Sequence, residues 1–251
     1  MSKRLLVHLI LYITFLKFIL STTYTCLSSA SCGCSANSAV VTKIVGGEPA
    51  SNATWGWAAS LRHSSTGSHF CGGSIISSTY ILTAAHCTIG LSSPSAVRVY
   101  VGSIYLYTTA QVRDVSRIYI HPRYSPSTYV NDISILKLSS PIDLTQSGVN
   151  LICLPNVSYS ILASEEYPPA GINLVAIGWG VQAEGSNQVS SVLRQVTLQS
   201  VAASSTYCQN VHLNNASAQF CAGVMPGGTK GDYIYINDIL VNTKKTIYSF
   251  V

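Results

Sequence analysis

The stretch "HFCGGSIISSTYILTAAHC", residues 69–87, shows the pattern that decides the fold of this chain. It holds two short runs rich in β-branched and aromatic residues, residues 69–77 and 79–85. Short runs of this kind, bounded by small polar residues, are typical of antiparallel β-strands. A cysteine stands near each end of the stretch, and a histidine directly precedes the second cysteine. The stretch therefore predicts a pair of strands that ends at a histidine.

Similar runs continue on both sides. One set covers residues 56–63, 97–109, 112–122 and 133–138, and a second set covers residues 172–180, 192–201 and 218–224. Residues 141–170 are rich in Pro, Ser and Gly and are interpreted as a linker with long loops. Only residues 202–211 favour a short helix. At 251 residues, this pattern predicts an all-β chain in two antiparallel halves, either one large unit or two small barrels.

Charge argues against a nucleic-acid partner. Only 9% of the residues are charged, and the net charge of +5 is spread over scattered arginines. Nucleic-acid binding proteins instead gather basic residues on one face.

The first 25 residues have the layout of a secretory signal. "MSKR" is basic, residues 5–20 are apolar, and "STTYT" supplies small residues for cleavage. The alternative is a membrane anchor, but the apolar run of about 16 residues is shorter than the ~20 needed to cross a bilayer, and Lys17 interrupts it. We predict a signal peptide over residues 1–25, a secreted, extracellular protein, and no membrane attachment after cleavage.

Secretion makes the eight cysteines candidates for disulfides. Cleavage of the signal near Thr23 or Thr25 keeps their number even, whereas cleavage after Ala30 would remove Cys26. Residues 26–43 show no periodic apolar pattern and are interpreted as a loose pro-segment. Three sequons for N-glycosylation begin at Asn52, Asn156 and Asn215.

Four motifs together resemble the trypsin/chymotrypsin-like serine peptidases: "KIVGG" at 43–47, "ILTAAHC" at 81–87, "NDISILKL" at 131–138 and "AIGWG" at 176–180. The resemblance runs from about Lys43 to Lys230, so residues 44–230 are interpreted as a partial protease domain. It implies two six-stranded antiparallel Greek-key β-barrels with the active site between them. It also implies protein or peptide substrates and a monomer.

The resemblance assigns catalytic roles to two residues. His86 matches the general base, which takes a proton from a hydroxyl nucleophile and returns it to the leaving amine. Asp132 matches the carboxylate that fixes the tautomer of this histidine and stabilises its protonated form. Taken alone, His86 could be a packed histidine at a strand end, and Asp132 could cap a turn.

Activation and disulfides also follow from the resemblance. Cleavage between Lys43 and Ile44 by a trypsin-like protease would free an α-ammonium that orders the substrate pocket. Cys71 would pair with Cys87 and Cys208 with Cys221, while Cys153 would tether the pro-segment through Cys26, Cys32 or Cys34. No cofactor or metal is expected, because residues 102–114, which match the family's calcium loop, contain no Glu.

The third catalytic residue is missing. The family continues after "CAGVMPGG" to "GDSGGP", which carries the nucleophilic serine and the oxyanion hole, but here "GDYIYIND" follows Lys230. Of the 21 residues at 231–251, 12 are Ile, Tyr, Asn, Lys or Phe, whose codons are rich in A and T. We interpret residues 231–251 as a non-homologous tail, with translation of an intron as the leading hypothesis, and expect an incomplete second barrel.

These observations predict a secreted serine endopeptidase zymogen whose 251-residue chain is inactive as written. The alternative is a non-catalytic pseudoprotease that acts as a binding or regulatory module. A regulated non-functional splice form is a third possibility.

Overall fold

The structure is a computed structural model. It describes residues 21–25, 30–34, 36–42, 47–108, 111–154, 166–181, 188–209, 219–223, 240–242 and 246–248. Within these ranges, no helix combines the length and the apolar character that a membrane span requires.

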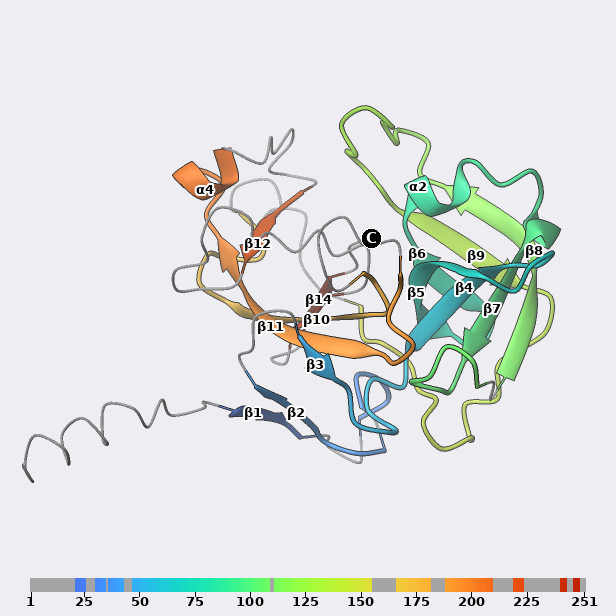
Figure 1. Cartoon of the computed structure of the whole chain (residues 1–251). Coiled ribbons are helices and arrows are strands. Elements are labelled where there is room, and N and C mark those ends of the chain that lie inside the picture. Colours follow the sequence, from blue (N-terminus) through green and yellow to red (C-terminus); the bar gives the residue numbers. More distant parts are fainter. Residues whose placement is uncertain are drawn as a thin grey trace, which may run out of the picture.

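The strands between residues 58 and 138 form a closed barrel, on the right in Figure 1. Its strands follow one another around the barrel in the order β4-β5-β6-β9-β8-β7, and all pairs are antiparallel. Alternate residues of β9 point inward, because every second side chain of a strand faces the same side. The strands are β4 (Ala58–His63), β5 (His69–Ser77), β6 (Tyr80–Thr83), β7 (Val97–Val101), β8 (Gln111–Ile120) and β9 (Ser134–Leu138).

A close approach between strands explains the second glycine of the opening motif, Gly73. A Cβ atom at this position would lie 2.8 Å from Cγ2 of Ile81 and 3.1 Å from the carbonyl oxygen of Leu82. Strands β5 and β6 therefore approach so closely here that only glycine fits without displacing β6. This close approach places the end of β6, and the histidine that follows it, against the barrel.

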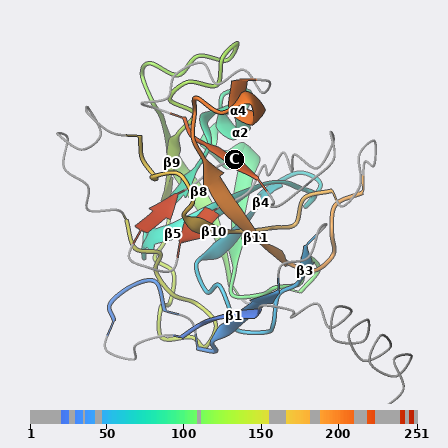
Figure 2. The same ribbon diagram turned by 90° about the vertical axis from the view of Figure 1, so that its left-hand side faces the viewer.

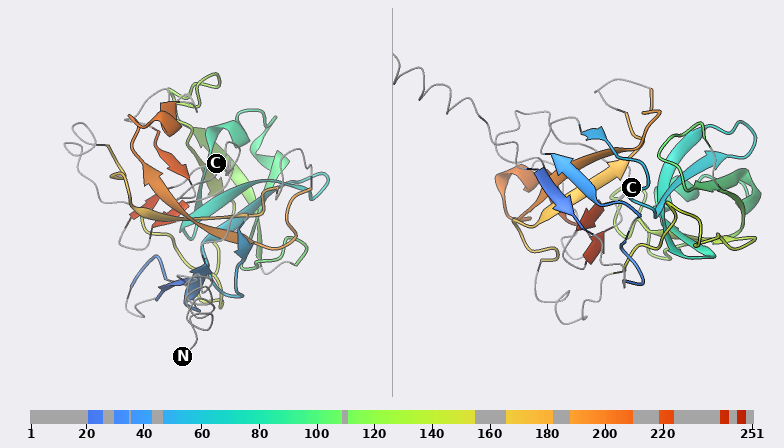
Figure 3. Two further views of the ribbon diagram at one scale, coloured as in Figure 1. Left: turned by 60° about the vertical axis from the view of Figure 1, so that its left-hand side comes forward. Right: turned by 90° about the horizontal axis from the view of Figure 1, so that it is seen from below.

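The second half forms an open sheet in the part of the chain that the structure describes. Its order is β12-β11-β10-β13-β14, and β3 pairs with the other end of β11. Both halves lie side by side in Figure 3, with the pro-segment next to the open sheet. The strands are β3 (Glu48–Pro49), β10 (Asn173–Gly178), β11 (Arg194–Val201), β12 (Cys221–Gly223), β13 (Leu240–Asn242) and β14 (Thr246–Tyr248).

The tail contributes strands to this second sheet. β13 and β14 both belong to residues 231–251, and β13 pairs antiparallel with β10. The sequence predicts an all-β, trypsin-like fold with an incomplete second barrel, and the closed barrel beside an open sheet agrees with this prediction. Within the residues interpreted as a non-homologous tail, the backbone of residues 240–241 pairs with residues 175–176 of β10.

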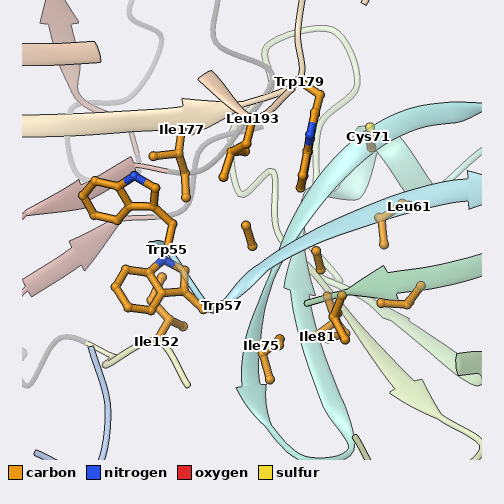
Figure 4. Close-up of a cluster of buried hydrophobic side chains, with 14 of the residues drawn as sticks. Trp55, Trp57, Leu61, Cys71, Ile75, Ile81, Ile152, Ile177, Trp179 and Leu193 are labelled. Atoms are coloured by element: carbon orange, nitrogen blue, oxygen red, sulfur yellow. The ribbon is translucent and has the colours of Figure 1, made fainter. Parts of the chain in front are cut away.

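One hydrophobic core spans both halves. Its largest members include three tryptophans, Trp55, Trp57 and Trp179, and Figure 4 shows Ile177 and Leu193 of the second half packed beside them. A separate small cluster on the other face of the second sheet consists of Leu174, Ala176, Val196 and Leu198. The closed barrel thus shares its core with one face of the open sheet.

Helices are few and short among the described residues: α2 (Ala85–Thr88), η1 (Pro94–Ala96) and α4 (Thr206–Gln209). α4 lies within the helix predicted over residues 202–211. The strand predicted over residues 97–109 ends at Val101 instead, because Gly102 adopts a left-handed conformation with φ 82°.

The pro-segment is not loose where the structure describes it. β2 (Ala39–Thr42) pairs antiparallel with β1 (Ser21–Tyr24), and Val41 is fully buried. Figure 2 shows β1 below β11, at the lower edge of the molecule. The sequence analysis missed this hairpin because "AVVT" is too short to show a period, and its contacts lie far away in the sequence.

Candidate active site

His86 stands in α2, directly after the last strand residues of β6. Its ring nitrogen Nδ1 lies 2.6 Å from Oδ2 of Asp132, and its backbone N–H donates to Oδ1 of the same carboxylate at 2.8 Å. Asp132 precedes β9, which pairs with β6 in the barrel. The neighbouring strands therefore deliver the imidazole and the carboxylate to the same end of the barrel, and both carboxylate oxygens contact His86.

This geometry sets the chemistry of the histidine. With the carboxylate accepting from Nδ1–H, the neutral ring carries its free lone pair on Nε2. A proton taken up at Nε2 would create a cation beside the Asp132 carboxylate, which stabilises it. The side chains of His86 and Asp132 are 25% and 14% exposed, so the pair is partly shielded from water but accessible to a substrate.

A buried hydroxyl pair joins the two segments behind this dyad. The hydroxyl of Thr88 donates to Oγ of Ser134 at 2.9 Å, and both residues are almost fully buried. Thr88 is in α2 and Ser134 opens β9, so this bond holds the histidine segment against the aspartate segment. The sequence analysis missed it because a single hydroxyl two residues after His86 or Asp132 has no pattern that predicts its partner.

The loop before Asp132 has a strained backbone. Tyr129 and Asn131 adopt left-handed conformations with φ 54° and 58°, which are uncommon for residues other than glycine. The side-chain amide of Asn131 donates to the carbonyl of Arg123 at 2.8 Å, and this bond helps to fix the loop. The ring of Tyr129 lies edge-on to the imidazole of His86, with 5.8 Å between ring centroids.

Two further interactions involve the loop before Asp132. Burial raises the pKa of the Tyr124 hydroxyl, and the charge of Asp132 adds to that effect, because a second anion near the carboxylate is unfavourable. From the second sheet, Nε2 of Gln219 donates to the carbonyl of Thr128 at 3.0 Å. The loop that carries Asp132 is therefore in contact with both halves of the domain.

The disulfides match the two pairs that the resemblance implies. Cys71 is bonded to Cys87, which directly follows His86, and Cys208 is bonded to Cys221. The first bond fixes α2 to β5, and the second fixes α4 to β12.

The structure also selects among the three pro-segment cysteines. Cys153 is bonded to Cys32, and Cys34 is also disulfide-bonded.

One group of residues has the spacing of a metal site. Ligand atoms of Cys71, His86 and Cys87 all lie within 4.8 Å of one another. The two sulfur atoms are joined in a disulfide, so they are not thiolates and offer no anionic ligand. The group is explained by the Cys71–Cys87 disulfide, which lies beside His86.

His69 of β5 shows how a histidine can serve structure instead. Its Nδ1 lies 2.9 Å from the hydroxyl of Ser60, and its ring packs edge-on against Trp179. Burial, with a smaller contribution from the charge of Arg62, lowers its pKa to about 4. His69 is therefore neutral at neutral pH and joins the barrel to the second sheet.

Several predicted site residues lie outside the described residues: Lys43, Ile44, Asn156, Asn215 and the stretch 224–239 that follows "CAG". Asn52 is described and exposed, and its side-chain oxygen accepts from the backbone N–H of Ala53.

Known proteins are similar to this chain in sequence and in fold. A sequence model of the family Trypsin matches residues 44–233. Trypsin alpha of Drosophila melanogaster is 36% identical over 177 residues, which cover 69% of this chain and 64% of that protein. Transmembrane protease serine 7 of Mus musculus is 33% identical over 207 residues, which cover 80% of this chain and 24% of the relative. The chain thus spans less than two thirds of the length of both relatives.

A solved structure supports the same assignment. The scabies mite inactivated protease paralogue S-D1 superposes with a TM-score of 0.65 at 26% identity, covering 81% of this chain and 83% of that one. The family match covers most of the chain and includes the His86–Asp132 dyad. The chain therefore belongs to the trypsin family of serine proteases.

Proposed function

We propose that this chain carries the acid–base half of the active site of a secreted serine endopeptidase zymogen. The observation that carries the proposal is the dyad, in which Asp132 contacts both the ring and the backbone of His86. His86 acts as the general base through Nε2, and Asp132 holds its tautomer and stabilises the imidazolium. The substrates are proteins or peptides, as for trypsin-like proteases generally.

The proposed reaction needs a nucleophile that the 251 residues do not supply in the family's "GDSGGP" form. A general base has no hydroxyl to activate without it. The oxyanion donors are part of the same motif, and each contributes roughly 3–4 kcal/mol to transition-state stabilisation in such enzymes. We therefore expect this chain by itself to be inactive.

Activation is proposed to occur by cleavage between Lys43 and Ile44 by a trypsin-like protease. Secretion as a monomer and glycosylation at Asn52, Asn156 and Asn215 complete the proposal. The exposed position of Asn52 supports its use. Cleavage of residues 1–25 as a signal peptide remains a prediction.

A non-catalytic role is the second candidate. The name of the structural neighbour, an inactivated protease paralogue, shows that this fold also occurs in proteins described as inactive proteases. In this role the dyad is retained without turnover, and the two halves of the domain serve as a binding or regulatory module.

A fluorophosphonate probe distinguishes these functions. The unmodified chain should show no labelling above background, since the probe reacts with an activated serine. A chimera in which the segment after Lys230 is replaced by the corresponding C-terminal part of Drosophila trypsin alpha should be labelled once it has been cleaved before Ile44. His86→Ala in this chimera should lower kcat by roughly 10⁴-fold or more.

Labelling of the unmodified chain would contradict the proposed lack of a nucleophile. A correctly folded, cleaved chimera that stays unlabelled would contradict the catalytic role of the dyad and favour the binding module.

A further inference from the structure

We infer that the pro-segment is a docked chain that stays bound to the protease domain after cleavage at Lys43, even without its disulfide, with Gln195 as the residue that holds it. The cleavage itself belongs to the proposed function. The docking does not, because it depends only on contacts between residues 30–42 and the domain. Three groups of contacts carry the inference.

The first contact lies at the disulfide. Cys32 is bonded to Cys153, and the backbone N–H of Gly33 donates to the carbonyl of Leu151 at 2.8 Å. Gly33 has φ +69°, and a Cβ atom there would lie 2.9 Å from the sulfur of Cys153. The pro-segment backbone therefore fits closely against residues 151–153, and a hydrogen bond remains there when the disulfide is removed.

The second contact lies in the middle of the segment. The backbone N–H of Asn37 donates to the carbonyl of Ala53 at 3.2 Å, and its side-chain amide donates to the carbonyl of Asn52 at 3.0 Å. Ala53 has φ 56°, so the turn at 52–53 presents two carbonyl groups to one asparagine. These bonds fix the direction in which the segment approaches the second sheet.

The third contact is the burial of β2. Val41 is 0% exposed and Ala39 is 5% exposed, whereas Val40 between them is 46% exposed. Val41 belongs to the same core cluster as Trp55 and Trp57. Burial of an apolar side chain away from water favours the docked strand. One face of β2 is thus part of the hydrophobic core.

Gln195 of β11 joins this strand to the domain. Its Nε2 donates to the carbonyl of Val40 at 2.7 Å and to Oε1 of Glu48 at 3.0 Å, while its Oε1 accepts from Nε1 of Trp55 at 2.7 Å. Gln195 is only 3% exposed. A buried amide without partners is unfavourable, so loss of β2 would leave one donor of this side chain without its acceptor.

None of these contacts involves the residues that flank the cut, 43–46. Cleavage therefore leaves them in place, and the cleaved segment becomes a bound peptide rather than a free one. The ring of Tyr24 packs at 6.1 Å from that of Trp55, and Tyr24 pairs with Ala39. Cleavage of the signal after Thr23 would retain this support for β2, whereas cleavage after Thr25 would remove it and leave the contacts of residues 30–42.

The experiment removes the tether and cuts the chain. The full chain with Cys32→Ala and Cys153→Ala is cleaved at Lys43 with trypsin, and N-terminal sequencing verifies that a chain beginning Ile-Val-Gly-Gly appears. Size-exclusion chromatography with mass spectrometry should then find the fragment that ends at Lys43 in the same peak as the domain. Separation of the two in this chain would overturn the inference.

Neighbouring substitutions test which contacts hold the segment. Val41→Asp should weaken retention at least tenfold, because it buries a carboxylate. Val40→Asp is the matched control and should retain the fragment, since that side chain points to solvent. Gln195→Glu, which replaces the donor to Val40 by an acceptor, should also release the fragment. Equal retention in Val41→Asp and Val40→Asp would contradict the proposed docking.

Two measurements distinguish a failure of docking from a failure of cleavage and from misfolding of the variants. If Lys43 resists trypsin, a tobacco etch virus protease site inserted between Lys43 and Ile44 yields the same two chains, so failure of cleavage contradicts only the proposed activation site. Near-ultraviolet circular dichroism of the variants before cleavage separates release of the fragment from a failure to fold.

Discussion

The two halves of this domain reach a β-fold by different routes. The first barrel is built from residues 58–138, and every strand in it has two neighbours. The second sheet takes strands from residues 48–49 and 240–248 as well as from its own region. The first half is therefore defined by contiguous sequence, whereas the second depends on segments from both ends of the chain.

Their cores differ in the same way. The barrel interior belongs to the large cluster that also contains the three tryptophans, while the other face of the second sheet has a cluster of four buried residues in the described part of the chain. The His86–Asp132 dyad belongs wholly to the closed barrel. This difference suggests that the dyad tolerates changes in the second sheet, which the following predictions test, from the largest expected effect to the smallest.

Truncation of core leucines should give the largest difference in stability between the two halves. Leu136 and Leu174 are both fully buried, the first in the barrel and the second in the small cluster. We expect Leu136→Ala to lower the free energy of unfolding by about 4–5 kcal/mol, and Leu174→Ala by about 2–3 kcal/mol, because the smaller cluster can collapse around the cavity. Urea denaturation measures both, and equal losses would contradict the difference between the cores.

His69 links the two halves and should make their association depend on pH. Burial and the charge of Arg62 lower its pKa from 6.5 to about 4. Between pH 4 and pH 6.5 the unfolded chain binds more protons than the folded one. The contribution of the neutral His69 ring to the free energy of unfolding is therefore fully present above pH 6.5 and is lost as the pH falls toward 4. The full loss is about 3 kcal/mol.

Urea denaturation at pH 7 and pH 4.5 tests this effect. His69→Gln should remove the part of the pH dependence that comes from this residue. A variant with the same slope as the unsubstituted chain would show that other groups are responsible.

The two domain disulfides offer a matched pair across the halves. Cys71–Cys87 and Cys208–Cys221 close loops with sequence separations of 16 and 13 residues. Loop-closure entropy is therefore nearly the same for both, about 3 kcal/mol each. Replacing both cysteines of each pair by alanine should lower the midpoint of thermal unfolding in both variants.

The chemical shift of the His86 Nδ1–H proton, measured by NMR, distinguishes the two variants. It should change on loss of Cys71–Cys87, which adjoins His86, and remain in place on loss of Cys208–Cys221. A change in the second variant alone would show that the dyad depends on the second sheet.

The smallest change in the free energy of unfolding is expected for an exposed ion pair in the first barrel. Nε of Arg98 lies 2.8 Å from Oδ1 of Asp114, but the two side chains are 47% and 64% exposed. Arg98→Ala should change the free energy of unfolding by no more than about 0.5 kcal/mol, because water and salt screen such pairs. Arg98 is in β7 and Asp114 is in β8, and the two residues are partners in the strand pairing. If Arg98→Ala lowered the free energy of unfolding as much as Leu136→Ala, the pairing of these two strands would be much weaker than the closed barrel indicates.

The sequence by itself determined the first barrel and its dyad. Strand-like runs at residues 69–85 and 133–138 predicted β5, β6 and β9, and the motifs around His86 and Asp132 singled out the pair that the structure places 2.6 Å apart. The strands follow from local alternation and short turns. The pairing of His86 with Asp132 follows from the resemblance of their motifs to the serine peptidases.

Only the tertiary structure decided the rest. Cys32 rather than Cys34 joins Cys153, β2 lies in the core instead of in a loose pro-segment, and Gln195 gathers partners from residues 40, 48 and 55. The disulfide joins residues 121 positions apart and the bonds of Gln195 join residues 140 to 155 positions apart, and none of these contacts has a repeating pattern in the sequence. Such contacts depend on how completed strands pack together, which the order of residues along a short segment does not specify.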